Sequence, residues 1–540
     1  MTDLIVGVDA PADEFEAGAA EPQLPRAQRW RRSAAEIGSR RTRAVASIGM
    51  LLGVQALLMV PHPGTHFWID EALSVGIGRV PLRHIPSALR LDGNPPLWYV
   101  LVHFWLPVAG RSEAALHALS MAFAFACTPV AFAFGDRLFG RRTAWMAGLL
   151  VAANPFIVAY GREFRMYSLV TLLCLTASGS FALAFVRRLR RWLVAFSASL
   201  VLLLYTHTWS VFYVAGTLVA WGICIVWSTD RRALVTDGLL AYGAALVCWL
   251  PWIPELLYQA RHTGAPWSKV PDLRDALRTV PGVFGDPRAA LILVAGGLAA
   301  VMVAVRRRAT FGDRSITVLV VIVVVALFVA WAANRISPAW TLRYLSILVG
   351  TVLLLAGAAL ARARGSGTVA LLLVAMLWVD PVGRALRWHP AERASAKSPA
   401  ADIAQHVRGY VHPGDLVIST QVEQVPPLDF YLPHGLSYFT PAGPVADPGI
   451  VDWRDVTSRV QHGPDLDAVL RVVRQLPSGS RVLVVFPPPT PVNHHQPVWF
   501  QLIAERTDSW VPAIQSDADL RDGFLVWTGG GLTGWLATRS

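Results

Sequence analysis

The chain has 540 residues, of which 54% are hydrophobic and only 16% are charged, and its formal net charge is +12. Soluble domains carry roughly 25% charged residues, and disordered or nucleic-acid-binding chains are richer in charge. The composition therefore excludes a soluble, a disordered and a nucleic-acid-binding protein, so no nucleic acid is expected as a partner. It indicates a protein that crosses a membrane several times.

Residues 1–43 begin acidic and rich in proline and alanine and then become rich in arginine, which predicts a disordered cytoplasmic tail. Apolar runs after this tail predict an α-helical polytopic protein with about eleven transmembrane helices. The expected spans are residues 44–60, 113–135, 143–160, 167–186, 192–206, 209–227, 234–254, 289–305, 315–333, 343–361 and 368–385.

A further apolar run, residues 96–108, is too short to cross and is expected at the membrane surface. Cytoplasmic loops are enriched in basic residues, and five basic loops face the cytoplasm together only if this run does not cross. The topology then predicts a multi-pass protein of the plasma (inner) membrane with a first outer loop at 61–112. The five loops contain Arg137–Arg142, Arg187–Arg191, Arg231–Arg232, Arg306–Arg308 and Arg362–Arg364.

Two soluble features are expected outside. The apolar residues of Ile69–Leu91 recur at helical spacing, which predicts one amphipathic helix along the membrane surface. After a transmembrane module of residues 44–385, residues 386–540 predict an extracytoplasmic α/β domain, with strands at Asp415–Thr420 and Arg481–Phe486 and a helix at Leu466–Leu476. The sequence has no internal repeat and no phosphate-binding loop, which disfavours an ATP-driven pump.

Polar residues collect where the expected spans reach the outer side. Asp70 and Glu71 are adjacent in the first outer loop, and on a helix only one of them faces a given site. The alternative is that both merely favour a helix N-terminus. Asn94, the segment Gly161–Tyr167, His207 and Arg343-Tyr344 lie at other outer span ends, where a turn histidine or an arginine anchoring a helix end is the structural alternative.

Arginines on the outer side oppose the general charge bias, and charged groups at membrane depth are costly. Arginine is also suited to bidentate capture of phosphate. A carboxylate together with outward arginines therefore favours a lipid-phosphate substrate that enters from the bilayer.

Four motifs in order carry a resemblance to a known family: WIDEA, GNPPLWYVL, RLFGRR and GREFRMYSL. Over roughly residues 44–360 the chain resembles the C-type membrane glycosyltransferases (GT-C). It is most similar to family 39-like members, the relatives of protein O-mannosyltransferases and lipid A aminoarabinose transferases. The resemblance implies a polyprenyl- or dolichyl-phosphate-linked sugar donor used on the outer face, and a Pro-Pro helix along the membrane surface.

Residue by residue, the acidic position of the family matches Asp70, with Glu71 beside it. Its Glu-x-Arg-x-Tyr element matches residues 163–167, with Phe164 where alanine is commoner, and its late Arg-Tyr matches residues 343–344. The candidate catalytic residues are thus Asp70 and Glu71, and the candidate substrate-binding residues are Asn94, Arg162, Glu163, Arg165, Tyr167, His207, Arg343 and Tyr344.

The predicted reaction is one inverting displacement, with Asp70 as base and Arg165 and Arg343 neutralising the lipid phosphate. Arg162 is the weaker phosphate ligand, and His207 is expected to contact phosphate or sugar. No cofactor or metal is predicted, and the His494-His495 pair in a proline-rich loop is interpreted as solvated.

Alternatives remain at this stage. A transporter or flippase of lipid-linked sugars would also place polar groups in the membrane, although nearer its midplane and often in inverted repeats. A third interpretation makes the outer domain a binding module on a membrane scaffold. Mannose, arabinose and aminoarabinose are all open; the arginine-rich, lysine-poor composition suggests a GC-rich bacterial genome and favours a mannose-like sugar. The acceptor is a protein hydroxyl, a glycolipid or a wall polysaccharide.

Overall fold

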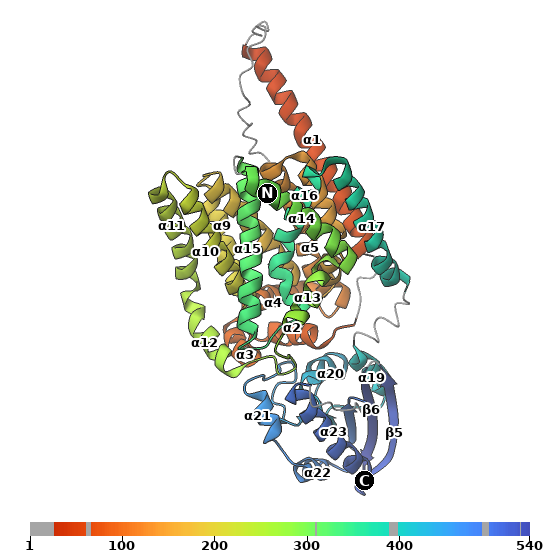
Figure 1. Cartoon of the computed structure of the whole chain (residues 1–540). Coiled ribbons are helices and arrows are strands. Elements are labelled where there is room, and N and C mark those ends of the chain that lie inside the picture. The colour runs from red at the N-terminus through yellow and green to blue at the C-terminus, as the bar shows by residue number, and fades with distance from the viewer. Residues whose placement is uncertain (1–25, 61–65, 308–309, 388–397, 489–495, 530) are drawn as a thin grey trace.

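A computed structural model of the chain describes residues 26–60, 66–307, 310–387, 398–488, 496–529 and 531–540. Within these residues a bundle of helices adjoins a smaller unit at the C-terminus that contains the sheet (Figure 1). The helices α2 and α3 lie at the end of the bundle that faces this C-terminal unit (Figure 1). Elements that are distant in sequence therefore meet in the region between the bundle and the C-terminal unit.

The bundle and its loops form the larger part of the chain. Its helical elements are α1 (Arg26–Met59), α2 (Ile69–Arg79), η2 (Leu82–His84), α3 (Ile85–Asp92), α4 (Leu97–Ala109), α5 (Glu113–Phe139), α6 (Arg141–Ala153), α7 (Pro155–Gly161), α8 (Tyr167–Phe181), η3 (Ala182–Val186), α9 (Trp192–Thr206), α10 (Ser210–Trp227), α11 (Arg231–Trp249), η4 (Leu250–Trp252), α12 (Ile253–His262), α13 (Leu273–Thr279), η5 (Val280–Phe284), α14 (Pro287–Arg307), α15 (Phe311–Asn334), η6 (Leu342–Leu345), α16 (Ser346–Arg362) and α17 (Arg364–Arg387).

Among the described residues, seven helices are long and apolar enough to cross a membrane, or eight if α6 and α7, which are bent by 50°, form one span. Three further expected spans fall on shorter apolar helices, α9 and the described parts of α14 and α17. The helix α4 is also short, as expected for residues 96–108. The chain is thus a multi-pass membrane protein. By length and composition, fewer of its helices qualify as spans than the eleven expected.

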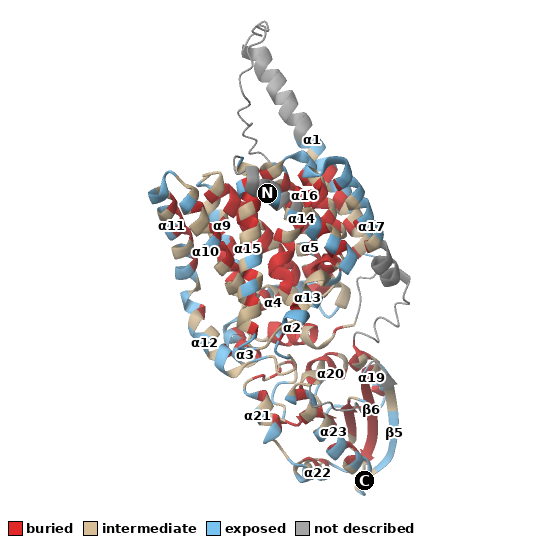
Figure 2. Cartoon of the chain, viewed as in Figure 1, coloured by how far each residue is buried: buried red, intermediate tan, exposed pale blue. Residues whose placement is uncertain are grey.

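Most residues of α8 and α16 are buried inside the bundle, whose interior is coloured red in Figure 2. Glycines allow α16 to approach its neighbours closely, as is common between membrane helices. A Cβ atom on Gly357 would lie 2.7 Å from the backbone nitrogen of Ala147 in α6, and one on Gly350 would lie 2.8 Å from the carbonyl oxygen of Thr171 in α8. These two close contacts fix the position of α16, which directly follows η6.

The expected single amphipathic helix at Ile69–Leu91 is wrong. The chain forms α2, a short η2 and α3, because Pro81 forces the preceding Val80 into an extended conformation with ψ 151° and so ends α2. Residues 71–78 of α2 are buried, and α2 packs against α4 and against α20 of the C-terminal unit. Thus α2 is an internal element, packed between α4 and α20.

The first helix also differs in extent, since α1 begins at Arg26 and so includes residues expected to belong to a disordered tail. The rest of that predicted tail, residues 1–25, lies outside the described residues, as does the His494-His495 pair.

The C-terminal unit is a mixed sheet with helices on both faces, with strand order β3-β2-β1-β4-β6-β5. The strand β1 pairs in parallel with β2 and β4, and the remaining pairs are antiparallel. The expected strands and helix are confirmed as β1, β4 and α22. The elements are α19 (Pro399–Val407), β1 (Leu416–Ser419), η7 (Val422–Gln424), α20 (Val425–Tyr431), β2 (Ser437–Thr440), β3 (Gly443–Pro444), α21 (Val456–Gln461), α22 (Leu466–Arg474), β4 (Arg481–Phe486), α23 (Val498–Gln515), β5 (Leu520–Gly529) and β6 (Leu532–Arg539).

Backbone contacts join the C-terminal unit to the bundle. The amide of Trp453 donates a 2.9 Å hydrogen bond to the carbonyl of Leu91 at the end of α3, and the amide of Asp455 donates to the carbonyl of His262 at 2.7 Å. Gly76 in α2 lies directly against Gly449, because a Cβ atom on Gly76 would lie 1.8 Å from the Gly449 carbonyl oxygen. The C-terminal unit is therefore seated on the same helices that carry the polar loop residues.

Candidate active site

An ion pair lies at the centre of the candidate site. Asp70, in the first turn of α2, accepts from Arg343 of η6, with 3.1 Å between Oδ2 and Nη1. The guanidinium of Arg343 also lies 5.0 Å from the ring centre of Trp68. This cation–π contact helps to fix the position of the guanidinium group. Both charged side chains keep some exposure, 19% for Asp70 and 15% for Arg343, so an incoming molecule can reach the pair.

Arg165 holds the backbone of α2 that carries Asp70. It lies in the bend between α7 and α8, and its Nη1 donates to the main-chain carbonyl of Asp70 at 3.2 Å and to the hydroxyl of Ser74 at 2.9 Å. A third neighbour is the hydroxyl of Tyr99, at 3.2 Å. A buried arginine with these partners fixes the first turn of α2, and hence the position of the Asp70 carboxylate.

A second carboxylate completes the polar floor. Asp92 at the end of α3 accepts hydrogen bonds from Tyr99 at 3.0 Å and from Asn94 at 2.7 Å. Burial raises the pKa of Asp92, while the nearby Arg165 and the two hydrogen bonds act in the opposite direction. Asp92 and Tyr99 were absent from the sequence-based set. Tyr99 belongs to the GNPPLWYVL motif and Asp92 directly precedes it.

Two cavities meet at the Asp70–Arg343 pair. The first has a volume of about 380 Å³, and six of the predicted site residues line it. The second has about 420 Å³ and shares Asp70, Arg343 and Tyr344 with the first. The predicted residues that line the first cavity are Asp70, Asn94, Arg165, His207, Arg343 and Tyr344.

His207 is a neutral hydrogen-bond donor in the wall of the first cavity. Its Nδ1 accepts from the amide of Trp209 at 3.1 Å, which places the proton of the neutral ring on Nε2. Burial, with the positive charges of Arg165 and Arg343, lowers the pKa of His207 to about 3. The imidazole can therefore donate to a substrate oxygen without carrying a positive charge.

Glu71 does not lie in either cavity, and a catalytic contact for it is not supported. Its carboxylate is fully buried, 2.7 Å from Nε2 of His117, and accepts from the amide of Phe164 at 2.7 Å. It therefore ties α2 to α5 and to the loop that carries Arg165. This is the geometry expected of adjacent carboxylates on one helix, of which only Asp70 faces the cavity.

Three other predicted residues also lie outside the cavity linings. Arg162 donates from Nε to the carbonyl of Met59 at the end of α1, at 3.0 Å, and so anchors that helix. Tyr167 packs its ring 6.1 Å from that of His207 and 6.4 Å from that of Tyr344. Glu163 lies in the same bend, and its charge acts on Arg343. These residues position the cavity wall.

Among the described residues, no three histidine, cysteine, aspartate or glutamate side chains are grouped so as to hold a metal ion. The charged and imidazole groups that line the two cavities are carboxyl groups, guanidinium groups, the Lys269 ammonium group and the neutral ring of His207, and amide and hydroxyl side chains lie among them. This set suits phosphate and hydroxyl groups.

Solved structures of other proteins align with nearly the whole chain. ArnT from Cupriavidus metallidurans in the apo state aligns with a TM-score of 0.62 at 16% identity, over 93% of this chain and 98% of that chain. The same protein bound to undecaprenyl phosphate aligns with a TM-score of 0.60 at 16% identity, over 92% and 97%. An oligosaccharyltransferase from Archaeoglobus fulgidus aligns with a TM-score of 0.52 at 12% identity, over 91% and 72%.

The chain therefore has the fold of these proteins, and in this chain a helical bundle is followed by a C-terminal unit. No protein-family model matches the sequence, and no curated protein does either. At these identities the likeness concerns the fold, and the assignment of activity depends on the residues at the two cavities.

Proposed function

We propose that this chain is a membrane glycosyltransferase that moves a sugar from a polyprenyl-phosphate-linked donor to an acceptor hydroxyl, with inversion at the anomeric carbon. The observation that carries the proposal is the Asp70–Arg343 pair at the junction of two cavities, with Arg165 buried beneath it. A carboxylate and a guanidinium are the two groups that such a transfer requires. The fold shared with ArnT, whose structure contains undecaprenyl phosphate, supports a lipid-phosphate donor.

Each group has a role in the proposed displacement. The acceptor hydroxyl gives its proton to the Asp70 carboxylate as its oxygen attacks the anomeric carbon, and the bond between that carbon and the phosphate oxygen breaks. The departing lipid phosphate takes the negative charge, which Arg343 neutralises. Arg343 is paired with Asp70; a bound phosphate competes for the guanidinium and releases the carboxylate to act as base.

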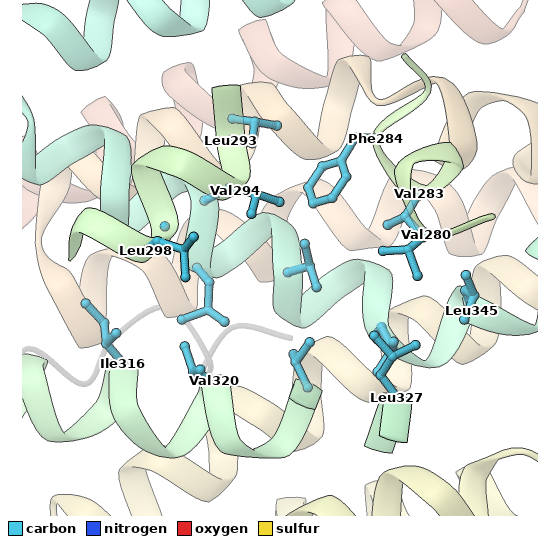
Figure 3. Close-up of a pocket in the computed structure, with 16 residues that line it drawn as sticks. Val280, Val283, Phe284, Leu293, Val294, Leu298, Ile316, Val320, Leu327 and Leu345 are labelled. Carbon is cyan, nitrogen blue, oxygen red and sulfur yellow. The ribbon is translucent and has the colours of Figure 1, made fainter. Parts of the chain in front are cut away.

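An apolar cavity of about 220 Å³ supports a donor with a long isoprenoid chain. It lies between η5, α14, α15 and α16, with Ile316 at one end and Leu345 at the other (Figure 3). Leu345, which lines this cavity, lies two residues after Arg343 in η6. A phosphate at Arg343 and a hydrocarbon chain along this cavity match the two halves of a polyprenyl phosphate.

The orientation is proposed from charge. Arg141 donates to the carbonyl of Arg43, and Arg142 to that of Arg364, so basic residues of three expected cytoplasmic segments lie together at one end of the bundle. Because basic loops stay in the cytoplasm, the two cavities and the C-terminal unit would face the outer side of the plasma membrane. There the site would meet membrane lipids and a glycan, lipid or protein acceptor.

The proposal is tested with membranes that contain the full chain and radiolabelled polyprenyl-phosphate mannose or arabinose. Asp70→Asn removes the base without changing the shape of the side chain, and the expected loss of product formation is about 10²- to 10⁴-fold. Asp230→Asn, at the N-cap of α11 where asparagine also caps, is the matched control and keeps full activity.

Membrane levels of both variants are measured alongside. Near wild-type transfer by Asp70→Asn would exclude Asp70 as the base. Movement of the labelled lipid across vesicles without a glycosylated product would support a transporter instead. The two labelled donors also test the preference for a mannose-like sugar, which remains a proposal.

A further inference from the structure

The second cavity is built by both parts of the molecule and is rich in aromatic rings. One wall comes from the bundle and its loops, and the other comes from the C-terminal unit, including η7 and the start of α23. Its aromatic lining residues are Trp68, Trp267, Trp340, Tyr344, Trp453, Trp499 and Phe500.

The rings are packed against one another across the boundary between the two parts. The centroid of Trp453, in the loop after β3, lies 4.8 Å from that of Trp267 in the bundle and 5.9 Å from that of Trp499 in α23. Aromatic clusters of this kind present flat apolar faces with polar edges. The cavity is therefore shaped by contacts that exist only when the C-terminal unit is seated.

A carboxyl group from the C-terminal unit lies in this wall. Glu423 of η7 interacts with the Trp499 side chain, but its Oε2 is buried and has no hydrogen-bond partner among the described residues. Burial raises the pKa of Glu423 to about 7, so the carboxyl is able to donate or accept a hydrogen bond near neutral pH. The other ionic groups that line the same cavity are Asp70, Lys269 and Arg343.

Residues that line the cavity also carry buried hydrogen-bond donors without a partner among the described residues. The indole nitrogens of Trp68 and Trp340 and the Nε of Arg343 are buried and have no hydrogen-bond partner among the described residues. Buried polar groups are rarely left unpaired, because an unmade hydrogen bond costs about 1–3 kcal/mol. Three donors and one carboxyl beside an aromatic wall suit a ligand with several hydroxyl groups.

We propose that the second cavity is the acceptor subsite, that it binds a saccharide, and that Glu423 holds one of the saccharide hydroxyls. A pyranose or furanose ring has apolar C–H faces that pack on aromatic rings and a rim of hydroxyls that pair with such donors and acceptors. Asp70 lines both cavities. A saccharide in the second cavity thus brings a hydroxyl to the base while the donor occupies the first.

This inference rests on the proposed function, because it assigns the acceptor of the same reaction. A glycolipid headgroup and a wall polysaccharide share the required chemistry. A peptide with a serine or threonine hydroxyl is the competing class, and it has few hydroxyls to match the unpaired groups.

The binding test uses the full chain, purified in lipid nanodiscs and applied to an array of bacterial-envelope saccharides, glycolipids, serine- and threonine-containing peptides and phospholipids. We expect retention on a subset of saccharides that Glu423→Gln weakens about tenfold, the value of one lost hydrogen bond. Phe500→Ala, at a partly exposed lining residue, is expected to weaken it as well. Glu505→Gln, an exposed position on the same helix α23, is the matched control and binds as wild type.

The array decides between acceptor classes. Retention on glycolipids but not on free saccharides identifies the glycolipid source, and the reverse identifies a polysaccharide. Retention on peptides alone, or saccharide binding that Glu423→Gln and Phe500→Ala leave unchanged, overturns the inference.

A kinetic test separates this inference from the proposed function. With a retained saccharide as acceptor, Glu423→Gln is expected to raise the acceptor KM about tenfold and to leave the donor KM unchanged; a change in the donor KM alone overturns the assignment. Asp70→Asn is expected to abolish transfer but to keep saccharide binding. Full transfer by Asp70→Asn would reject the proposed base while the acceptor subsite stands.

Discussion

Two neighbouring carboxylates in one turn of α2 have opposite environments. Asp70 faces the junction of the cavities and pairs with Arg343, whereas Glu71 is fully buried against His117. Successive side chains on a helix point about 100° apart, so the sequence shows that the two must differ. It does not show which one faces the site, because that depends on how α2 is rotated against α4 and α5.

His207 gives a testable pH dependence at the residue scale. Its pKa is lowered to about 3, first by burial and then by Arg165 and Arg343. Between pH 3 and 6.5 the unfolded chain binds a proton at this residue and the folded chain does not, so acid favours unfolding. Compared with His207→Gln, which does not titrate, the wild type is expected to lose thermal stability as the pH falls below 6.5.

The measurement is the unfolding temperature of the purified protein in detergent from pH 5 to pH 8, for both proteins. Above pH 6.5 the difference between their unfolding temperatures is expected to be constant. A difference that stays constant down to pH 5 would mean that His207 titrates alike in the folded and unfolded states, and would contradict its burial beside the two arginines.

At the scale of elements, proline and glycine decide how the site is assembled. Pro81 separates α2 from α3, which lets α2 enter the interior while α3 keeps one exposed face. Helical periodicity alone runs across this position, so periodicity predicted one continuous helix. The steric effect of proline on the preceding residue overrides it.

Gly357 in α16 is expected to be essential for the packing of the bundle. In Gly357→Ala the new Cβ would lie 2.7–2.8 Å from backbone atoms and the Cβ of Ala147, which cannot move as a flexible side chain does. Overpacking of this kind typically costs 1–3 kcal/mol. We expect a clear fall in the unfolding temperature and, because α16 directly follows η6, a loss of transfer.

The control is Gly243→Ala in α11, where no atom lies within 4 Å of the added Cβ. Alanine is also the better helix former by about 1 kcal/mol, so this variant is expected to be at least as stable as the wild type. Equal unfolding temperatures for the Gly357 and Gly243 variants would show that α16 and α6 are free to separate.

At the scale of the whole molecule, the C-terminal unit is part of the site. It supplies Glu423 and three aromatic residues to the second cavity, and it is seated on α2 through the contact of Gly76 with Gly449. A larger residue at this contact cannot be accommodated without a backbone shift, because a Cβ on Gly76 would lie 1.8 Å from a carbonyl oxygen.

Gly76→Ala is therefore expected to displace the C-terminal unit from the bundle. Displacement of a positioned group by about 1 Å costs roughly 10²-fold in rate, so transfer should fall by this factor while the protein remains in the membrane. Hydrogen exchange is expected to rise in η7 and in the loop around Trp453. Gly53→Ala in α1, with open space around its Cβ, is the control. Wild-type exchange and transfer in the Gly76 variant would show that the contact does not seat the unit.

The sequence by itself determined the properties that depend on local composition. Apolar length predicted the membrane helices, β-branched runs predicted β1 and β4, and motif order led to Asp70, Arg165 and Arg343, which the structure brings together. These features are encoded within single segments, because the length of an apolar run and its content of β-branched residues need no distant partner.

Only the tertiary structure decided which groups share a cavity. Tyr99 of α4 hydrogen-bonds both to Asp92 at the end of α3 and to Arg165 in the bend before α8, and Glu423 reaches the second cavity from η7, more than three hundred residues after Asp70 in the chain. The tertiary structure also placed Glu71 and Arg162 outside the linings of the two cavities. The physical reason is that rotation of a buried helix and the seating of one unit on another arise from packing between distant segments.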